Sequence, residues 1–148
     1  MSVDEIIHIL NEFVPFPEDD PVNDNESFLV GLMDRWKTTE GKNTAIPSIF
    51  RFMERYPHAR LGPPGPLIHA LEADDTTEYA TELRQSLMRR PTLLTLWMYN
   101  RLINAEKDRR LIEGHISRMR LFTKHPLADE PTKKQAQDFI NHQLKRLE

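Results

Sequence analysis

Helical periodicity, interrupted by proline, is the feature of this sequence that most constrains its fold. Apolar residues recur at spacings of three and four through most of the chain, which is the pattern of amphipathic helices. The prolines fall between these periodic segments, where each can begin or end a helix. No stretch alternates polar and apolar residues for long enough to predict a strand. The sequence therefore predicts an all-α protein.

About eight helices joined by short loops account for this pattern, and we expect them to pack as an irregular multi-helix array in one domain, 1–148. The first helix begins with the capping pair Ser2 and Glu5. The segment 93–105 is the most apolar, so we expect it to lie at the centre. The expected helices cover about 2–13, 26–39, 47–55, 66–71, 75–88, 93–105, 108–124 and 132–147.

Two segments between the helices are rich in proline. Residues 14–25 contain three prolines and form an acidic loop. Residues 57–66 form a proline/glycine-rich connector that includes Gly62, Gly65 and Pro66. The connector lacks the Gly-Lys-Ser/Thr end of a phosphate-binding loop. We interpret it as a rigid link that fixes the angle between two helices; the alternative is a polyproline-type ligand for a partner protein.

Composition excludes several kinds of protein. Cysteine is absent from the 148 residues, which rules out disulfides, thiolate catalysis and cysteine-ligated zinc or iron–sulfur clusters. No apolar run approaches the ~20 residues of a transmembrane helix. The first residues lack the basic and apolar regions of a signal peptide. We therefore expect a cytoplasmic protein that does not bind membranes.

Charge is distributed unevenly along the chain. Residues 1–30 hold eight acidic residues and no Lys or Arg, whereas residues 81–148 hold fourteen basic and eight acidic residues. Such asymmetry indicates an acidic face and a basic face, or two solvated surfaces. The overall pI is about 6.1 and no nucleic-acid-binding motif is present, so we expect no direct contact with nucleic acid.

Few residues form patterns that suggest chemistry. His69 and Glu72 have a spacing that could place two metal ligands on one helix face, but no further ligand motif accompanies them, and we expect His69 to be a core or capping residue. Asn100 and Asn104 could line a ligand pocket, but we expect them to bind loop backbone, with the connector as the candidate segment. No nucleophile motif is present. We predict a protein without catalytic activity, cofactor or metal.

The sequence resembles small α-helical immunity proteins encoded beside bacterial polymorphic toxins, including those of contact-dependent growth inhibition systems. The resemblance covers about 50 residues and lies in Tyr56-Pro57, Leu61-Gly62-Pro63-Pro64-Gly65-Pro66-Leu67-Ile68-His69, Glu72, Tyr79, Leu83, Ser86, Arg90-Pro91-Thr92, Thr95, Trp97-Met98 and Asn100-Arg101-Leu102-Ile103-Asn104. It implies an all-α fold in which the connector, His69, Trp97 and the two asparagines are structural. It also implies that the chain neutralises a cognate toxin in a one-to-one complex.

Acidic patches are the candidate toxin-binding surface, because many such toxins are nucleases with basic clefts and complementary charge steers association. The residues are Glu18, Asp19, Asp20 and Asp24 in the loop with Glu26 directly after it, and Glu72, Asp74, Asp75 and Glu78 further on. One alternative is a non-catalytic helical adaptor that binds another protein. Another is a metal- or nucleotide-dependent enzyme that uses His69 and Glu72, which predicts bound metal in the purified protein.

Overall fold

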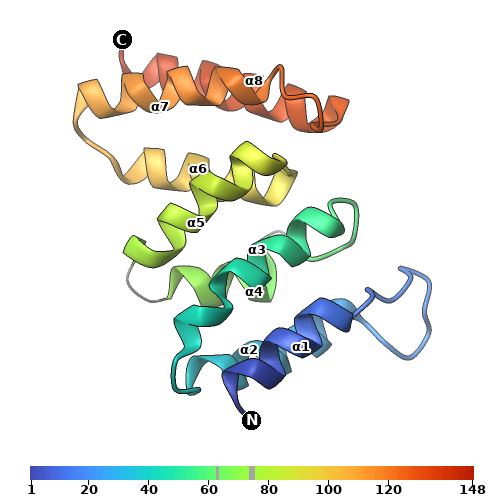
Figure 1. Ribbon diagram of the computed structural model, residues 1–148. Helices are drawn as coiled ribbons and strands as arrows, with labels where there is room; N and C mark the ends of the chain where they lie inside the picture. The colour runs from blue at the N-terminus through green and yellow to red at the C-terminus, as the bar shows by residue number, and fades with distance from the viewer. Residues whose placement is uncertain (63, 74–75) are drawn as a thin grey trace. The chain divides into compact units, whose positions relative to one another are not determined.

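The computed structural model describes residues 1–62, 64–73 and 76–148, and in these residues it is all-α, with no strand (Figure 1). Each of the eight expected helices is present. They are α1 (Val3–Glu12), α2 (Asn25–Lys37), α3 (Ile46–Arg55), α4 (Gly65–Glu72), α5 (Thr76–Arg89), α6 (Leu93–Ala105), α7 (Arg109–Phe122) and α8 (Glu130–Arg146), with a short 3₁₀ helix η1 (Lys42–Ala45) that the sequence pattern did not predict. No helix in the described ranges is long and apolar enough to cross a bilayer.

Side-chain caps set where the helices begin. The Ser2 hydroxyl accepts a hydrogen bond from the Glu5 amide at 3.2 Å, as the sequence predicted. Asp129 caps α8 by accepting from the Thr132 amide at 2.9 Å. The helix therefore starts two residues before the expected position, because Pro131 is tolerated in a first turn, where its missing N–H has no helical partner.

The first compact unit spans Met1–Glu82, and in it α1 packs against α2 and α3 while α2 packs against α4. Arg55 on α3 donates a hydrogen bond to the carbonyl of Leu10 at the end of α1, at 2.9 Å. After α2, Gly41 adopts a left-handed φ of 71° and turns the chain into η1. The largest fully buried side chains of this unit are Trp36, Phe50, Phe52, Ile6, Leu10, Leu29, Met33, Ile49, Met53, Leu61 and Leu67.

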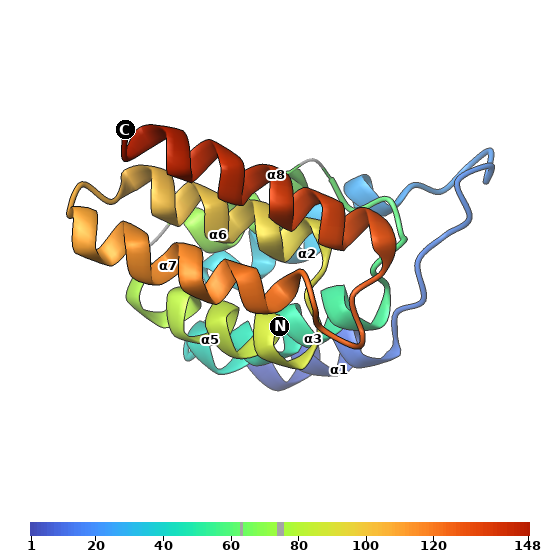
Figure 2. The ribbon, with the colours of Figure 1, turned by 90° about the horizontal axis from the view of Figure 1, so that it is seen from above.

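The second compact unit spans Leu83–Glu148. Its helices follow one another in alternating directions, and α8 packs against both α6 and α7 (Figures 1 and 2). Helix α6 contributes the buried residues Thr95, Leu96, Met98, Tyr99, Asn100 and Ile103, in keeping with its apolar sequence. The chain thus contains two helical units, and the expectation of one domain stays a prediction.

Two glycines of the connector are required by local geometry. A Cβ built on Gly62 would collide with the backbone carbonyl of Pro64. Gly65, at the first residue of α4, has φ +82°, which other residues rarely adopt. Pro66 follows in the first turn, where proline is favourable. These features support the interpretation of the described part of the connector as a rigid link, while Pro63 lies outside the described residues.

We predict that Gly62→Ala lowers the free energy of unfolding by about 1–3 kcal/mol, because the new methyl group must push backbone atoms apart. Gly31→Ala is the matched control. Gly31 is exposed inside α2 and has open space around it, so alanine there should raise stability by about 0.5–1 kcal/mol. Urea unfolding of both variants measures the difference. A Gly62→Ala variant as stable as the original would show that the connector can relax.

Candidate functional site

The acidic loop is closed at its base by aromatic rings. Phe13, at the end of α1, stacks on Phe28 of α2 with ring centroids 4.1 Å apart. Phe16 meets both rings edge-on, at 5.4 Å from Phe13 and 6.2 Å from Phe28. Phe52 of α3 extends the cluster at 5.8 Å from Phe13. Because aromatic pairs bury much apolar area, this cluster fixes both ends of the loop to the first unit.

Asn25 ties the loop backbone to the start of α2. Its side-chain oxygen accepts from the Phe16 amide at 2.7 Å, and its side-chain nitrogen donates to the Phe16 carbonyl at 3.3 Å. Asn25 is buried, so both polar groups of its amide need partners inside the protein. The pair of hydrogen bonds joins residues nine apart and makes residues 16–25 a closed loop.

Two aspartates shape the loop from within. Asp20 accepts hydrogen bonds from the amides of Asn23 and Val22, both at 2.9 Å, and these bonds lower the pKa of Asp20. Asp24 caps α2: it accepts from the Ser27 hydroxyl and from the Ser27 amide, and these bonds lower the pKa of Asp24. Both carboxylates therefore stay charged while they hold the turn.

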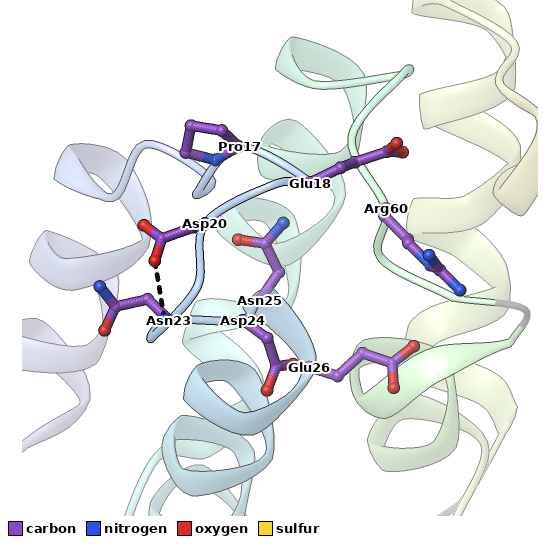
Figure 3. A pocket seen from close by; sticks show the side chains of 8 residues that line it. All are labelled: Pro17, Glu18, Asp20, Asn23, Asp24, Asn25, Glu26 and Arg60. Atoms are coloured by element: carbon purple, nitrogen blue, oxygen red, sulfur yellow. Dashed lines mark hydrogen bonds between the residues drawn. The ribbon is translucent and has the colours of Figure 1, made fainter.

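The inside of the loop forms a pocket of about 280 Å³ (Figure 3). Four carboxylates surround it with a single arginine, Arg60, which reaches it from the segment after α3. In the described part of the chain, Arg60 forms no ion pair with Glu18 or Glu26, and the pocket keeps a negative charge. Its lining residues are Pro17, Glu18, Asp20, Asn23, Asp24, Asn25, Glu26 and Arg60.

The structure brings together only part of the predicted acidic surface. Asp19 is exposed on the loop but does not line the pocket. Glu72, half-buried, ends α4, and Glu78 is exposed in the first turn of α5; neither lines the pocket. Asp74 and Asp75 lie outside the described residues. Of the predicted acidic residues, Glu18, Asp20, Asp24 and Glu26 thus share one pocket.

The predicted structural residues occupy different settings. His69 is exposed in the last turn of α4, so it is not a core residue. In the described ranges, no group of three or more His, Asp or Glu side chains is arranged to hold a metal ion. Trp97 is half-buried on α6. Among the side chains that the structure describes, no third ligand joins His69 and Glu72, while Asp74 and Asp75 lie outside those residues.

The asparagine pair binds a side chain rather than a loop backbone, which corrects the sequence prediction. Gln143 of α8 donates to the side-chain oxygens of both Asn100 and Asn104, each at 2.8 Å. Arg146 donates to Gln143 and to the carbonyls of Ile103, Asn104 and Glu106, which end α6. The sequence could not indicate this partner, because Gln143 lies about 40 residues away in a polar helix.

Sequence reasoning also missed Arg60, Asn25 and the pair of Tyr99 and His115 in the second unit, in which Tyr99 is buried and His115 half-buried. Arg60 gave one signal, because it is a basic residue inside the proline/glycine-rich connector. In this pair, the Tyr99 hydroxyl lies 2.8 Å from Nδ1 of His115. Burial lowers the pKa of His115, and the positive charge of Arg118 lowers it further.

This pair predicts a loss of stability in mild acid. Because the pKa of His115 is lowered in the folded state, its neutral ring contributes stability above the ordinary pKa of about 6.5, and this contribution is lost as the pH falls through the folded value. Unfolding free energies measured from about pH 7 to pH 5 should fall less steeply for His115→Gln. Tyr99→Phe should keep most of the slope, since burial is the larger cause; equal slopes for His115→Gln and the original would contradict the assignment.

Comparison with protein-family models, with curated proteins and with solved structures found no match.

Proposed function

We propose that this chain is an immunity protein, which binds a cognate bacterial toxin and neutralises it by covering the active site or the substrate-binding surface. A nuclease is the expected class of toxin. The observation that carries the proposal is the pocket at the acidic loop, which is surrounded by three carboxylates of the loop and by Glu26 at the start of α2. Asn25 holds the loop backbone in place through its hydrogen bonds to Phe16. The resemblance of the connector and of the α6 sequence to immunity proteins supports the same function.

The loop has the properties that a rigid recognition element needs. Asp20 and Asn25 fix its backbone before any partner binds, so little conformational entropy is lost in forming a complex. Its negative charge complements a cleft that binds nucleic-acid phosphates, and such complementarity speeds association. Val22, 86% exposed beside these carboxylates, offers an apolar contact as well.

A growth assay tests this proposal. The candidate toxin is the C-terminal segment of the adjacent upstream reading frame, expressed in cells with and without this chain. We expect the segment to stop growth and this chain to restore it, and the two proteins to co-purify in a one-to-one complex.

Two results would contradict the proposal. The segment could be harmless, or it could stop growth equally with and without this chain. The helical adaptor would then become the leading hypothesis, and capture of partners from the native cell would be the next experiment. Deletion of an immunity protein should kill only cells that meet the toxin, whereas loss of an adaptor should act without it.

A further inference from the structure

A second pocket lies in the other helical unit, and it differs in character from the acidic loop. It encloses about 320 Å³, close to the lower end of the sizes of small-molecule sites. Helices α5, α6 and α7 line it with side chains that are mostly apolar. The lining residues are Arg84, Leu87, Met88, Tyr99, Arg118, Leu121 and Phe122.

The two outer helices contribute the same pattern of residues. On α5 the order is Arg84, Leu87, Met88, and on α7 it is Arg118, Leu121, Phe122. Residues three and four apart share a helix face, so each helix presents one arginine and two apolar side chains to the pocket. Figures 1 and 2 show α5 and α7 running in the same direction. Both arginines therefore lie toward one end, and the apolar side chains lie about one turn, ~5 Å, further along.

The arginines have no carboxylate partner in the described part of the chain. Their positive charge affects the Tyr99 hydroxyl, which lines the pocket. Burial raises the pKa of this hydroxyl, while Arg118 and Arg84 lower it. Burial is the main cause of the lowered pKa of His115, which lies within hydrogen-bond distance of the Tyr99 hydroxyl; Arg118 and Arg84 lower it further, whereas Glu106 raises it. The cationic end is thus uncompensated, as an anion-binding site requires.

The apolar end of the pocket is exposed to solvent. Met88 is 59% exposed and Leu121 is 56% exposed, although both are large apolar side chains. Leu87, Tyr99 and Phe122 are buried beneath them and give the pocket a packed floor. A ligand that covers Met88 and Leu121 would gain about 25 cal/mol for each Å² of apolar surface removed from water.

We propose that this pocket binds a small amphipathic carboxylate, with its carboxylate between Arg84 and Arg118 and its apolar body over Met88 and Leu121. A small molecule fits better than a protein segment because the pocket is compact and has one cationic end and one apolar end. This proposal is independent of the acidic loop and of the proposed immunity function.

Octanoate is the probe for the first test, with calorimetry giving the affinity and the Met88 methyl group reporting the location by NMR. Octanol has the same apolar body without the charge, and acetate has the charge without the body. We expect octanoate to bind at least tenfold more tightly than either and to shift the Met88 signal. If octanol binds as well as octanoate, if octanoate does not bind, or if it leaves the Met88 signal unchanged, the proposal is overturned.

Variants separate the two ends of the site. Arg84→Gln with Arg118→Gln should weaken octanoate binding about tenfold or more. Arg110→Gln with Arg120→Gln removes the same charge from exposed positions of α7 that do not line the pocket, and it should leave binding unchanged. Leu121→Ser should weaken octanoate and any residual octanol binding alike.

A peptide provides the last comparison. A short acidic peptide that contains leucine tests whether the pocket instead receives a protein segment. We expect it to bind more weakly than octanoate. Tighter binding of the peptide, with the same dependence on both arginines, would make the pocket a protein docking site and overturn the assignment of a small ligand.

Discussion

Replacing Glu18 and Glu26 by lysine should slow the association of this chain with its proposed toxin by about tenfold or more at low ionic strength. Both side chains line the acidic pocket, yet neither holds the loop in shape. Glu26 lies in the first turn of α2, where an acidic residue is favourable, so the folding cost should be only about 0.3–1 kcal/mol. Stopped-flow mixing at several salt concentrations measures the rate, and added salt should shrink the difference.

The matched control for this variant is Asp34→Lys with Asp138→Lys. Both aspartates are exposed on helices and do not line the pocket, and the substitutions change net charge by the same amount. We expect the control to associate at close to the original rate and to protect cells in the growth assay. If the two variants slow association equally, the effect belongs to net charge and the loop is not the contact surface.

Gln143→Leu should lower the free energy of unfolding by about 2–3 kcal/mol and the melting temperature by roughly 5–10 °C. Gln143 is 1% exposed, and its amide supplies the hydrogen bonds to Asn100 and Asn104. Leucine would leave the buried oxygen of Asn100 without a donor, and it would also remove an acceptor from Arg146. Thermal unfolding gives the magnitude, and hydrogen exchange of the α6 and α8 amides locates the loss in the second unit.

A double substitution distinguishes hydrogen bonding from packing. Asn100→Leu with Gln143→Leu removes both polar groups, so no buried oxygen is left unsatisfied, and it should recover more than half of the loss. Gln137→Leu, which breaks an exposed hydrogen bond with Asn141 on the same helix, should change stability by less than about 0.5 kcal/mol. A double variant less stable than Gln143→Leu would point to overpacking instead.

Local sequence patterns predicted most of the secondary structure because a helix begins and ends through residues that are close in sequence, such as caps and prolines. The segment 93–105 was placed without error, since Thr92 and Thr95 form a complete capping box and no proline interrupts the apolar run. The start of α8 was placed two residues late, because the cap at Asp129 lies before a proline that the pattern treats as a stop. Helix η1 was missed, as it depends on the left-handed turn at Gly41 and on a hydrogen bond from the Trp36 indole to the Lys42 carbonyl, at 2.8 Å.

The site was only partly predictable because its geometry depends on contacts between distant residues. Composition was enough to locate the acidic loop at 14–25. It could not show that Asn25 would hold Phe16, or that Arg60 would reach the pocket from beyond α3. The asparagine pair shows the same limit: a buried amide needs a partner, but the sequence does not say which residue supplies it. Only the packing of α8 against α6 brings Gln143 to the two asparagines.

The four carboxylates that surround the acidic pocket divide into two kinds. Those of Asp20 and Asp24 are engaged by the loop's own amides, whereas those of Glu18 and Glu26 face the pocket without holding the backbone. Substitutions of Asp20 or Asp24 therefore alter the shape of the loop, whereas substitutions of Glu18 or Glu26 alter the charge of the pocket and leave the loop backbone in place. In the evolution of such proteins, substitutions at these two positions could therefore change the charge of the partner surface that the pocket attracts, while the loop that presents them keeps its structure.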